Sequence, residues 1–234
     1  MELVSNDELA FTRMVVASGT RIDGRSRNEH RAVEIIPSEI SQSDGSIRLK
    51  RGSTEIEVSI QFKETVETLL ALGIRPCTKA SDLSESRVES FGMEIPSIIS
   101  TRIEEFLSSY KLGIRIELRV VRNNGNVYDL FFIGLNSILR NICVPVIEDL
   151  KKGEKETIDI ALPTTVALFE NGVFVKDPTI IEEKASLGLL HVIIDSSGRL
   201  MGCISERNCH LMHDELAKII KALVVEHTHT KSIQ

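Results

Sequence analysis

The sequence predicts an α+β fold. Its 234 residues fit one large domain, and 42% apolar and 26% charged residues are ordinary values for a globular protein. Strand-type alternation and helix-type spacing of apolar residues both recur along the chain, with no Pro/Gly/Ser-rich linker between them. We therefore expect a short N-terminal arm or helix over residues 1–17 and a single α+β domain over residues 18–234.

The expected strands follow from alternation of apolar and polar side chains. Residues 56–62 and 114–120 place an apolar residue at every second position, which is typical of half-buried strands. Asn171-Gly172 is a strong hairpin signal, and it would set Val166 and Leu168 opposite Val173 and Val175. The other expected strands cover residues 32–37 and 47–52 and a second hairpin, residues 189–194 and 200–204.

The expected helices show apolar spacings of three and four. One begins at Pro96, and another covers residues 127–142 and is ended by Pro145. A third begins at Asp177-Pro178, with Asp177 as N-cap, and the last begins at Asp214. Residues 63–93 are expected to hold a short strand and a loop, and residues 151–156 a solvated charged turn.

Composition and charge limit the classes of function. With 28 Lys and Arg against 34 Asp and Glu, the net charge of −6 does not concentrate polyanions, so any nucleic-acid contact must come from a local patch. The densest basic stretch is residues 21–31, with four arginines. These arginines either bind phosphates or pair with neighbouring acids, and the sequence supports both alternatives equally. No apolar run approaches about 18 residues and the first ten residues carry no base, so we expect an intracellular protein with no membrane contact and with reduced cysteines.

Motifs for cofactors and metals are weak. The chain has no phosphate-binding glycine loop, so we expect no nucleotide cofactor. The spacing of Cys203, Cys209, His210 and His213 falls outside the usual zinc patterns. Three acids near a helix start, Asp177, Glu182 and Glu183, could hold Mg²⁺, but composition favours an N-cap with solvated first-turn acids. We therefore predict neither a cofactor nor a metal.

Four motifs, taken together in order, resemble the RNase PH family. They are Arg21-Ile22-Asp23-Gly24-Arg25, then Asp44-Gly45-Ser46 with Leu49, Gly52 and Thr54, then residues 122–129, and finally Asp177-Pro178-Thr179 with Glu182-Glu183. The resemblance covers about residues 18–225 and is to the family's non-catalytic exosome branch. It implies the RNase PH-like fold (ribosomal protein S5 domain 2-like), with mixed sheets covered by helices, assembled into a six-membered ring.

The resemblance also implies that catalysis is absent. The family's phosphate-binding loop supplies a hydroxyl and a guanidinium, and the matching positions here are Val127 and Tyr128. The position matched to a catalytic Asp is Leu189. The alternative, an active phosphate-dependent 3′-to-5′ exoribonuclease, would need Arg at Tyr128 and Asp at Leu189, and an unrelated soluble enzyme would require the four motifs to be coincidental.

The implied role is a structural subunit that supports 3′-to-5′ RNA processing and degradation and guides RNA to a catalytic partner. The implied partners are other RNase PH-type subunits, S1/KH cap subunits, a hydrolytic exoribonuclease and single-stranded RNA, in the nucleus (including the nucleolus) and the cytoplasm. Basic side chains would hold the RNA backbone without reading its sequence. The candidate RNA contacts are Arg21, Arg25, Arg31, Arg48, Lys50 and Arg51.

Overall fold

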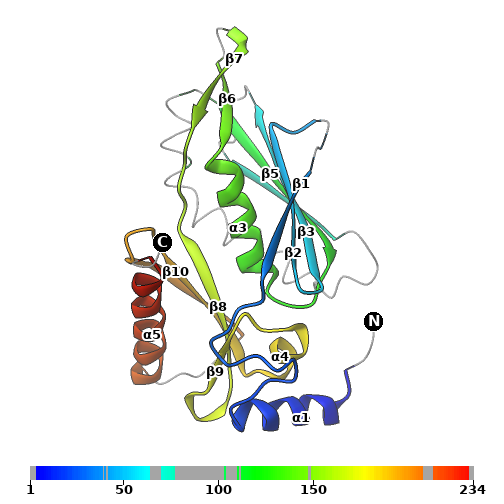
Figure 1. Cartoon of the computed structure of the whole chain (residues 1–234), viewed down its shortest axis with the longest axis vertical. Coiled ribbons are helices and arrows are strands. Elements are labelled where there is room, and N and C mark those ends of the chain that lie inside the picture. The colour runs from blue at the N-terminus through cyan, green and yellow to red at the C-terminus, as the bar shows by residue number, and fades with distance from the viewer. Residues whose placement is uncertain are drawn as a thin grey trace. The chain divides into compact units, whose positions relative to one another are not determined.

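The computed structural model describes residues 4–38, 40, 42–63, 70–76, 103, 110, 112–146, 149–207 and 213–231 (Figure 1). The chain divides into two compact units. Unit 1 comprises residues 1–32, 124–129 and 161–234, and unit 2 comprises residues 33–123 and 130–160. Helix α3 (Val127–Leu139) begins in unit 1 and continues into unit 2.

Unit 2 contains a five-stranded mixed sheet with the order β1-β2-β3-β5-β4. Its strands are β1 (Val33–Pro37), β2 (Gly45–Arg51), β3 (Thr54–Lys63), β4 (Leu70–Pro76) and β5 (Gly113–Arg122). Strand β4 is parallel to β5, whereas the other neighbours are antiparallel. The four strands predicted between residues 32 and 120 are confirmed, and β4 lies in the segment where a short strand was expected.

One face of this sheet packs against α3. A Cβ added at Gly134 of α3 would lie 2.6 Å from Leu49 Cδ1 and 3.1 Å from Val58 Cγ2, so a larger residue there would require these side chains to shift. Leu49, Val58 and Leu118 are fully buried. Because side chains alternate across a strand, the neighbouring residues of β2, β3 and β5 lie on the opposite, polar face.

Two predictions for the end of α3 are wrong. The helix ends at Leu139, and Ile142 begins strand β6 (Ile142–Val146), which pairs with β7 (Asp149–Glu156). Pro145 therefore lies in a strand, at a register irregularity where its missing N–H donor is tolerated. The charged residues 151–156 belong to β7 instead of forming a turn.

Unit 1 contains a four-stranded sheet with the order β11-β10-β8-β9. Its strands are β8 (Leu162–Leu168), β9 (Phe174–Lys176), β10 (Gly188–Ile194) and β11 (Leu200–Glu206). Both predicted hairpins are confirmed, with one change of register: Leu168 pairs with Phe174 and Val166 with Lys176. The connection is wider than expected because residues Glu170–Gly172 form a 3₁₀ turn, η1, so Val173 lies outside the strand.

Helices cover both faces of this second sheet. Helix α5 (His213–Lys231) packs through Ile219 and Leu223 on a face that includes Val166 and Val192. Helices α1 (Asn6–Ala17) and α4 (Ile180–Ala185) contribute Val16 and Ala185 to a cluster on Ala167, Phe169, Val175 and Leu189. The alternation of Val166 and Ala167 between the two clusters is what a strand buried on both sides requires.

Most of the helix predicted from Pro96 lies outside the described residues, where only Ile103 and Tyr110 are assigned, both helical. The last helix is confirmed, with Asp214 and Glu215 in its first turn. None of the helices in the described part of the chain is long and apolar enough to cross a membrane.

Candidate functional site

The N-terminal arginines of unit 1 meet the segment between β9 and α4. Arg21 donates from Nε to Glu182 Oε1 at 2.8 Å and from Nη2 to Oε2 at 2.6 Å, with 0% of its side chain exposed. The same guanidinium donates to the carbonyls of Lys176 and Asp177 at 2.9 and 3.0 Å. Glu182 is 2% exposed, so this is a buried, bidentate ion pair.

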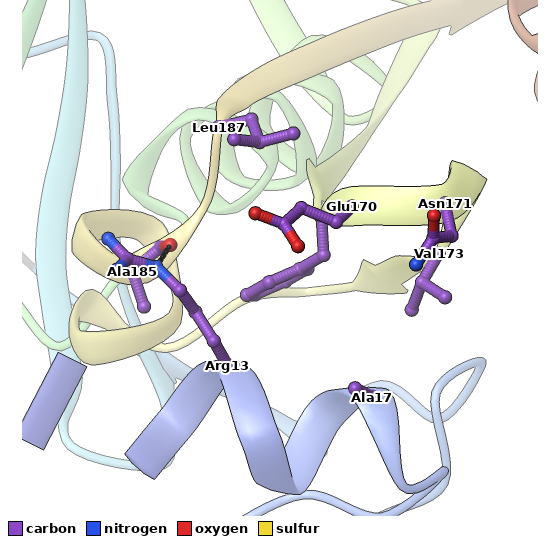
Figure 2. Close-up of a pocket in the computed structure, with 8 residues that line it drawn as sticks. Arg13, Ala17, Glu170, Asn171, Val173, Ala185 and Leu187 are labelled. Carbon is purple, nitrogen blue, oxygen red and sulfur yellow. Dashed lines mark hydrogen bonds between the residues drawn. The ribbon is translucent and has the colours of Figure 1, made fainter. Parts of the chain in front are cut away.

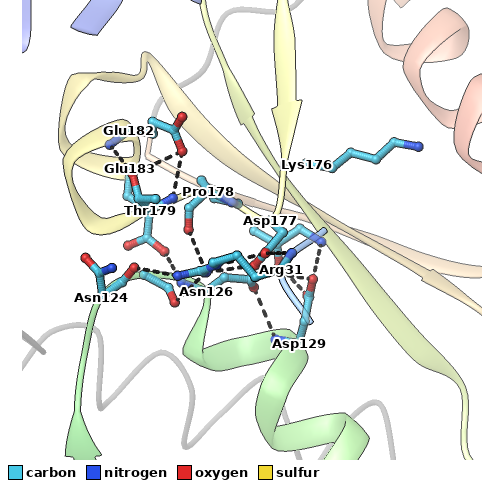
Figure 3. Close-up of polar contacts among 12 residues, drawn as sticks. Arg31, Asn124, Asn126, Asp129, Lys176, Asp177, Pro178, Thr179, Glu182 and Glu183 are labelled. Atoms are coloured by element: carbon cyan, nitrogen blue, oxygen red, sulfur yellow. Dashed lines mark hydrogen bonds and ion pairs between the residues drawn. The ribbon is translucent and has the colours of Figure 1, made fainter. Parts of the chain in front are cut away.

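Asp177 is the centre of a second group of contacts (Figure 3). Arg31 donates to Oδ1 from Nη2 at 2.8 Å and to Oδ2 from Nε at 2.9 Å, and Arg25 Nη1 donates to Oδ2 at 3.0 Å. The Arg31 backbone N–H and Asn126 Nδ2 add two further bonds at 2.8 Å. Asp177 is 0% exposed and has a φ of +46°, a conformation that Asp tolerates better than most residues.

The loop before α3 fits tightly against the start of α4. Gly125 has a φ of +91°, and a Cβ there would lie 2.5 Å from backbone atoms of Pro178, Thr179 and Ile180. The next amide, Asn126 N, donates to Glu183 Oε1 at 2.6 Å. The backbone of this loop is thus held by a carboxylate of the same chain.

A chain of buried polar groups extends from this loop into the sheet. Thr165 Oγ1 donates to Asp129 Oδ1 at 2.5 Å and lies 2.7 Å from His191 Nδ1, and His191 Nε2 lies 3.1 Å from Glu206 Oε1. The ring of Tyr128 contacts the His191 ring, with centroids 4.2 Å apart. Sequence analysis did not identify Thr165 or His191, because a single polar residue inside a strand carries no spacing signal.

The structure corrects the prediction for the start of α4. The N-cap is Thr179, whose hydroxyl accepts from the Glu182 N–H while the Glu182 carboxylate accepts from the Thr179 N–H. Asp177 does not cap the helix, because remote arginines occupy its carboxylate. Glu182 and Glu183 are buried, at 2% and 1% exposed, so the expectation of solvated acids is wrong.

Of the two alternatives for residues 21–31, the structure shows arginine–acid pairing for Arg21, Arg25 and Arg31. Contact of these residues with RNA stays a prediction. Burial raises the pKa of Asp23, but the hydrogen bonds and charge of Arg25 outweigh it and leave the pKa of Asp23 below its ordinary value. These guanidiniums pair with Asp177 and Glu182, two of the three carboxylates that were considered as Mg²⁺ ligands.

The basic candidates on β2 lie on two different faces. Arg51 is 3% exposed and shares the buried face with Leu49, whereas Arg48 and Lys50 lie on the polar face. The Arg48 side chain is 38% exposed and pairs with Glu55 and Glu57. Arg119, which sequence analysis did not name, pairs with Glu57 at 3.1 Å and is 56% exposed.

The side chain of Leu189 is fully buried in the apolar cluster beneath α1 and α4. Leu187, two residues earlier, is 52% exposed. A carboxylate at position 189 would therefore lie in the core and could not contact a ligand. A side chain at position 187 could, because that position is exposed.

No group of three or more metal-ligating side chains occurs among the residues that the structure describes. Cys209 and His210 lie outside those residues. Cys203 lies on β11, where burial raises the pKa of its thiol.

Comparisons with known proteins agree with this architecture. Residues 159–222 match the family described as 3′ exoribonuclease family, domain 2. Exosome complex component Rrp42 of Pyrococcus abyssi is 26% identical over 215 residues, which cover 80% of this chain and 78% of that protein. Rrp42 of Thermococcus onnurineus is 25% identical over 229 residues, covering 86% and 84%.

Solved structures show the same fold. A chain of the Archaeoglobus fulgidus exosome with RNA bound to the active site superposes with a TM-score of 0.82 at 18% identity, covering 97% of both chains. Rice (Oryza sativa) Rrp46 gives a TM-score of 0.62 at 15% identity, covering 89% of this chain and 95% of that one. The protein has an RNase PH-like α+β fold with mixed sheets, as predicted. Its similar proteins are components of exosomes.

Proposed function

We propose that this protein is a non-catalytic structural subunit of an RNA exosome ring, which supports 3′-to-5′ RNA processing and degradation and guides RNA to a catalytic partner. The similarity to Rrp42 proteins and to exosome chains supports membership of a ring. The observation that carries the non-catalytic part is the loop before α3, where the Asn126 N–H donates to Glu183.

A phosphorolytic enzyme must hold inorganic phosphate with N–H groups and positive charge. In the first turn of α3, directly after this loop, Val127 and Tyr128 are 2% and 1% exposed, so neither side chain faces solvent. The nearby Asp129 and Glu183 are buried carboxylates that would repel an anion. The guanidiniums that could offset this repulsion are those of Arg25 and Arg31, and they already bind Asp177.

The test is phosphorolysis of a single-stranded RNA 3′ tail by the purified chain in phosphate and Mg²⁺, with a phosphorolytic RNase PH-type enzyme as positive control. We expect no nucleoside diphosphate above the buffer blank. The double variant Tyr128→Arg/Leu189→Asp should also stay inactive, because catalytic groups act as a unit and Leu189→Asp buries a charge. Nucleoside diphosphate release by the unmodified chain would support the active exoribonuclease instead.

Within the exosome, we favour a subunit of the ribosomal RNA-processing protein 43 type, with the 42 and 45 types as alternatives. Three segments support this choice: Asp44-Gly45-Ser46, the segment from Asp177 to Glu183, and the hairpin after it. We propose RNase PH-type neighbours, S1/KH cap subunits and a hydrolytic exoribonuclease as partners, in the nucleus (including the nucleolus) and the cytoplasm. Affinity purification of the tagged chain from its source cell, followed by mass identification of stoichiometric partners, tests this. A stable monomer that ignores RNase PH-type subunits would contradict it.

For RNA contact we favour the polar face of the five-stranded sheet, where Arg48 and Lys50 lie with Arg119. These side chains reach solvent, whereas Arg21 and Arg51 are 3% exposed. In reconstituted rings, Arg48→Glu/Lys50→Glu should weaken RNA binding and flatten its salt dependence by about 0.7 in slope per lost phosphate contact. Arg140→Glu, which alters an exposed cation of the same unit, is the control. An unchanged slope would move the RNA contact to Arg21, Arg25 and Arg31.

A further inference from the structure

Unit 1 has a cavity of about 300 Å³ at its surface, between α1, α4 and the connection from β8 to β9 (Figure 2). Its lining combines two residues of α1 (Arg13 and Ala17) with Phe169, Glu170, Asn171, Val173, Ala185 and Leu187. The volume is at the lower end of the range for binding pockets. None of these residues belongs to the arginine–carboxylate network around Asp177.

The cavity has an apolar floor between two opposite charges. Phe169 and Ala185 form part of the buried apolar cluster below it. Figure 2 shows Arg13 and Glu170 extending from different elements toward the same space. Arg13 Nε donates to the Ala185 carbonyl at 2.8 Å, which fixes the guanidinium at the rim.

Neither charge is neutralised within the described part of the chain. Among those residues, Arg13 and Glu170 have no ion-pair partner, although their side chains line the same cavity. This differs from Arg21, Arg25 and Arg31, which all bind internal carboxylates. A pocket whose rim carries a cation and an anion that form no ion pair with the described residues is complementary to an apolar group flanked by both charges.

The surroundings of the cavity favour a macromolecular occupant. Leu187 is 52% exposed at the rim. An exposed apolar side chain beside a pocket with a charged rim is typical of protein interaction sites.

We propose that this cavity docks a segment of another protein, in which a bulky apolar side chain fills the pocket between a carboxylate that pairs with Arg13 and a cation that pairs with Glu170. The apolar side chain would contact Phe169 and Leu187. The proposal rests on the lining of this cavity and uses neither the proposed place in a ring nor any RNA contact.

The probe is a random 16-residue peptide library displayed on phage and panned on the immobilised full chain. We expect enrichment of peptides with one bulky apolar residue flanked on one side by Asp or Glu and on the other by Lys or Arg. Arg13→Glu should weaken the selected peptide at least tenfold, whereas Arg140→Glu, the same charge change in unit 2, should leave it unchanged. The double variant Arg13→Glu/Glu170→Lys should bind a peptide with the two charges exchanged.

Cavity filling is a second readout that keeps the charges intact. Ala17→Leu places a larger side chain in the cavity, and Ala10→Leu makes the same change at an exposed site of α1 outside it. Only Ala17→Leu should abolish peptide binding, with both variants showing the circular dichroism of the unmodified chain. Three results would overturn the proposal: no enriched motif, binding that survives both Arg13→Glu and Ala17→Leu, or stabilisation by free leucine or phenylalanine without any peptide binding.

Discussion

Replacing Asp177 with Asn removes one charge from the centre of the buried network and changes almost nothing else. The two side chains have the same shape, and Asn accepts the positive φ of this position at least as well as Asp. The backbone and the packing volume are therefore controlled. What changes is the pairing of Arg25 and Arg31, whose side chains are only 10% and 9% exposed.

The expected cost follows from the donors that face the carboxylate. Oδ1 accepts from Arg31 Nη2 and Asn126 Nδ2, and Oδ2 accepts from Arg31 N, Arg31 Nε and Arg25 Nη1. In Asn one of these two positions becomes an NH₂ group, so at least two donors lose their acceptor. Hydrogen bonds to charged groups contribute about 1.5–3 kcal/mol each, and breaking a buried ion pair costs about 3–5 kcal/mol. Both routes predict a loss of roughly 3–5 kcal/mol of unfolding free energy.

The assay is thermal and urea unfolding followed by far-UV circular dichroism. For a chain of this size, the predicted loss lowers Tm by roughly 6–20 °C. The control is Asp159→Asn, since Asp159 pairs with Arg140 at 2.7 Å where the side chains are 35% and 55% exposed. Such an exposed pair contributes about 0–1 kcal/mol. If Asp177→Asn is no more destabilising than Asp159→Asn, the arginines are not held by this carboxylate and the network described above is wrong.

Two further predictions concern the backbone and pH. Gly125→Ala should cost clearly more unfolding free energy than Gly24→Ala. Both residues have positive φ, which costs about 1–2 kcal/mol for Ala, but of the two only Gly125 would place a Cβ 2.5 Å from backbone atoms. Equal costs in urea unfolding would contradict the close approach to α4. In the hairpin between β10 and β11, the Ser197 hydroxyl and the Arg199 N–H hold the pKa of Asp195 well below its ordinary value. The Asp195 carboxylate therefore stabilises the fold fully above the ordinary Asp pKa of about 3.9, and this stabilisation is lost as the pH falls below that value toward the lowered pKa. Amide exchange at Ser197 and Arg199 should therefore be protected at pH 5 and accelerate in strong acid, and Asp195→Asn should remove this pH dependence.

Hydrophobic alternation was sufficient to predict the strands that are buried on one face, such as β3 with Val58 and Ile60 inward. The same reasoning failed where the apolar residues of one segment fit both the helical and the strand spacing. Ile142 continues the apolar spacing of α3, so the pattern predicts a helix that runs into β6 and ends at Pro145. The charged β7 pairs only with β6 and lacks the alternating apolar residues that would have predicted a strand.

The site was harder to predict than the fold because its contacts join residues far apart in the sequence. Arg21 and Glu182 are 161 residues apart, and nothing local distinguishes paired arginines from free ones. The local signals at Asp177-Pro178 favoured a helix cap, yet the carboxylate is bound by Arg31, which lies 146 residues away. The sequence analysis grouped Arg51 with Arg48 and Lys50, although the period-two alternation of β2 places Arg51 on the opposite face.

The long separation within the Arg21–Glu182 pair also has a consequence for synthesis. At about 5–20 residues per second, roughly 8–32 s pass between translation of Arg21 and of its acidic partner. During that interval the most basic stretch of the nascent chain has Asp23 beside Arg25 but lacks Asp177 and Glu182, the buried partners of Arg21, Arg25 and Arg31, and ribosomal RNA is the nearest polyanion. Unit 1 can close its network only after residue 183 has left the ribosome, so the N-terminal segment, the first part of that unit to be made, waits for most of the chain before its arginines are paired.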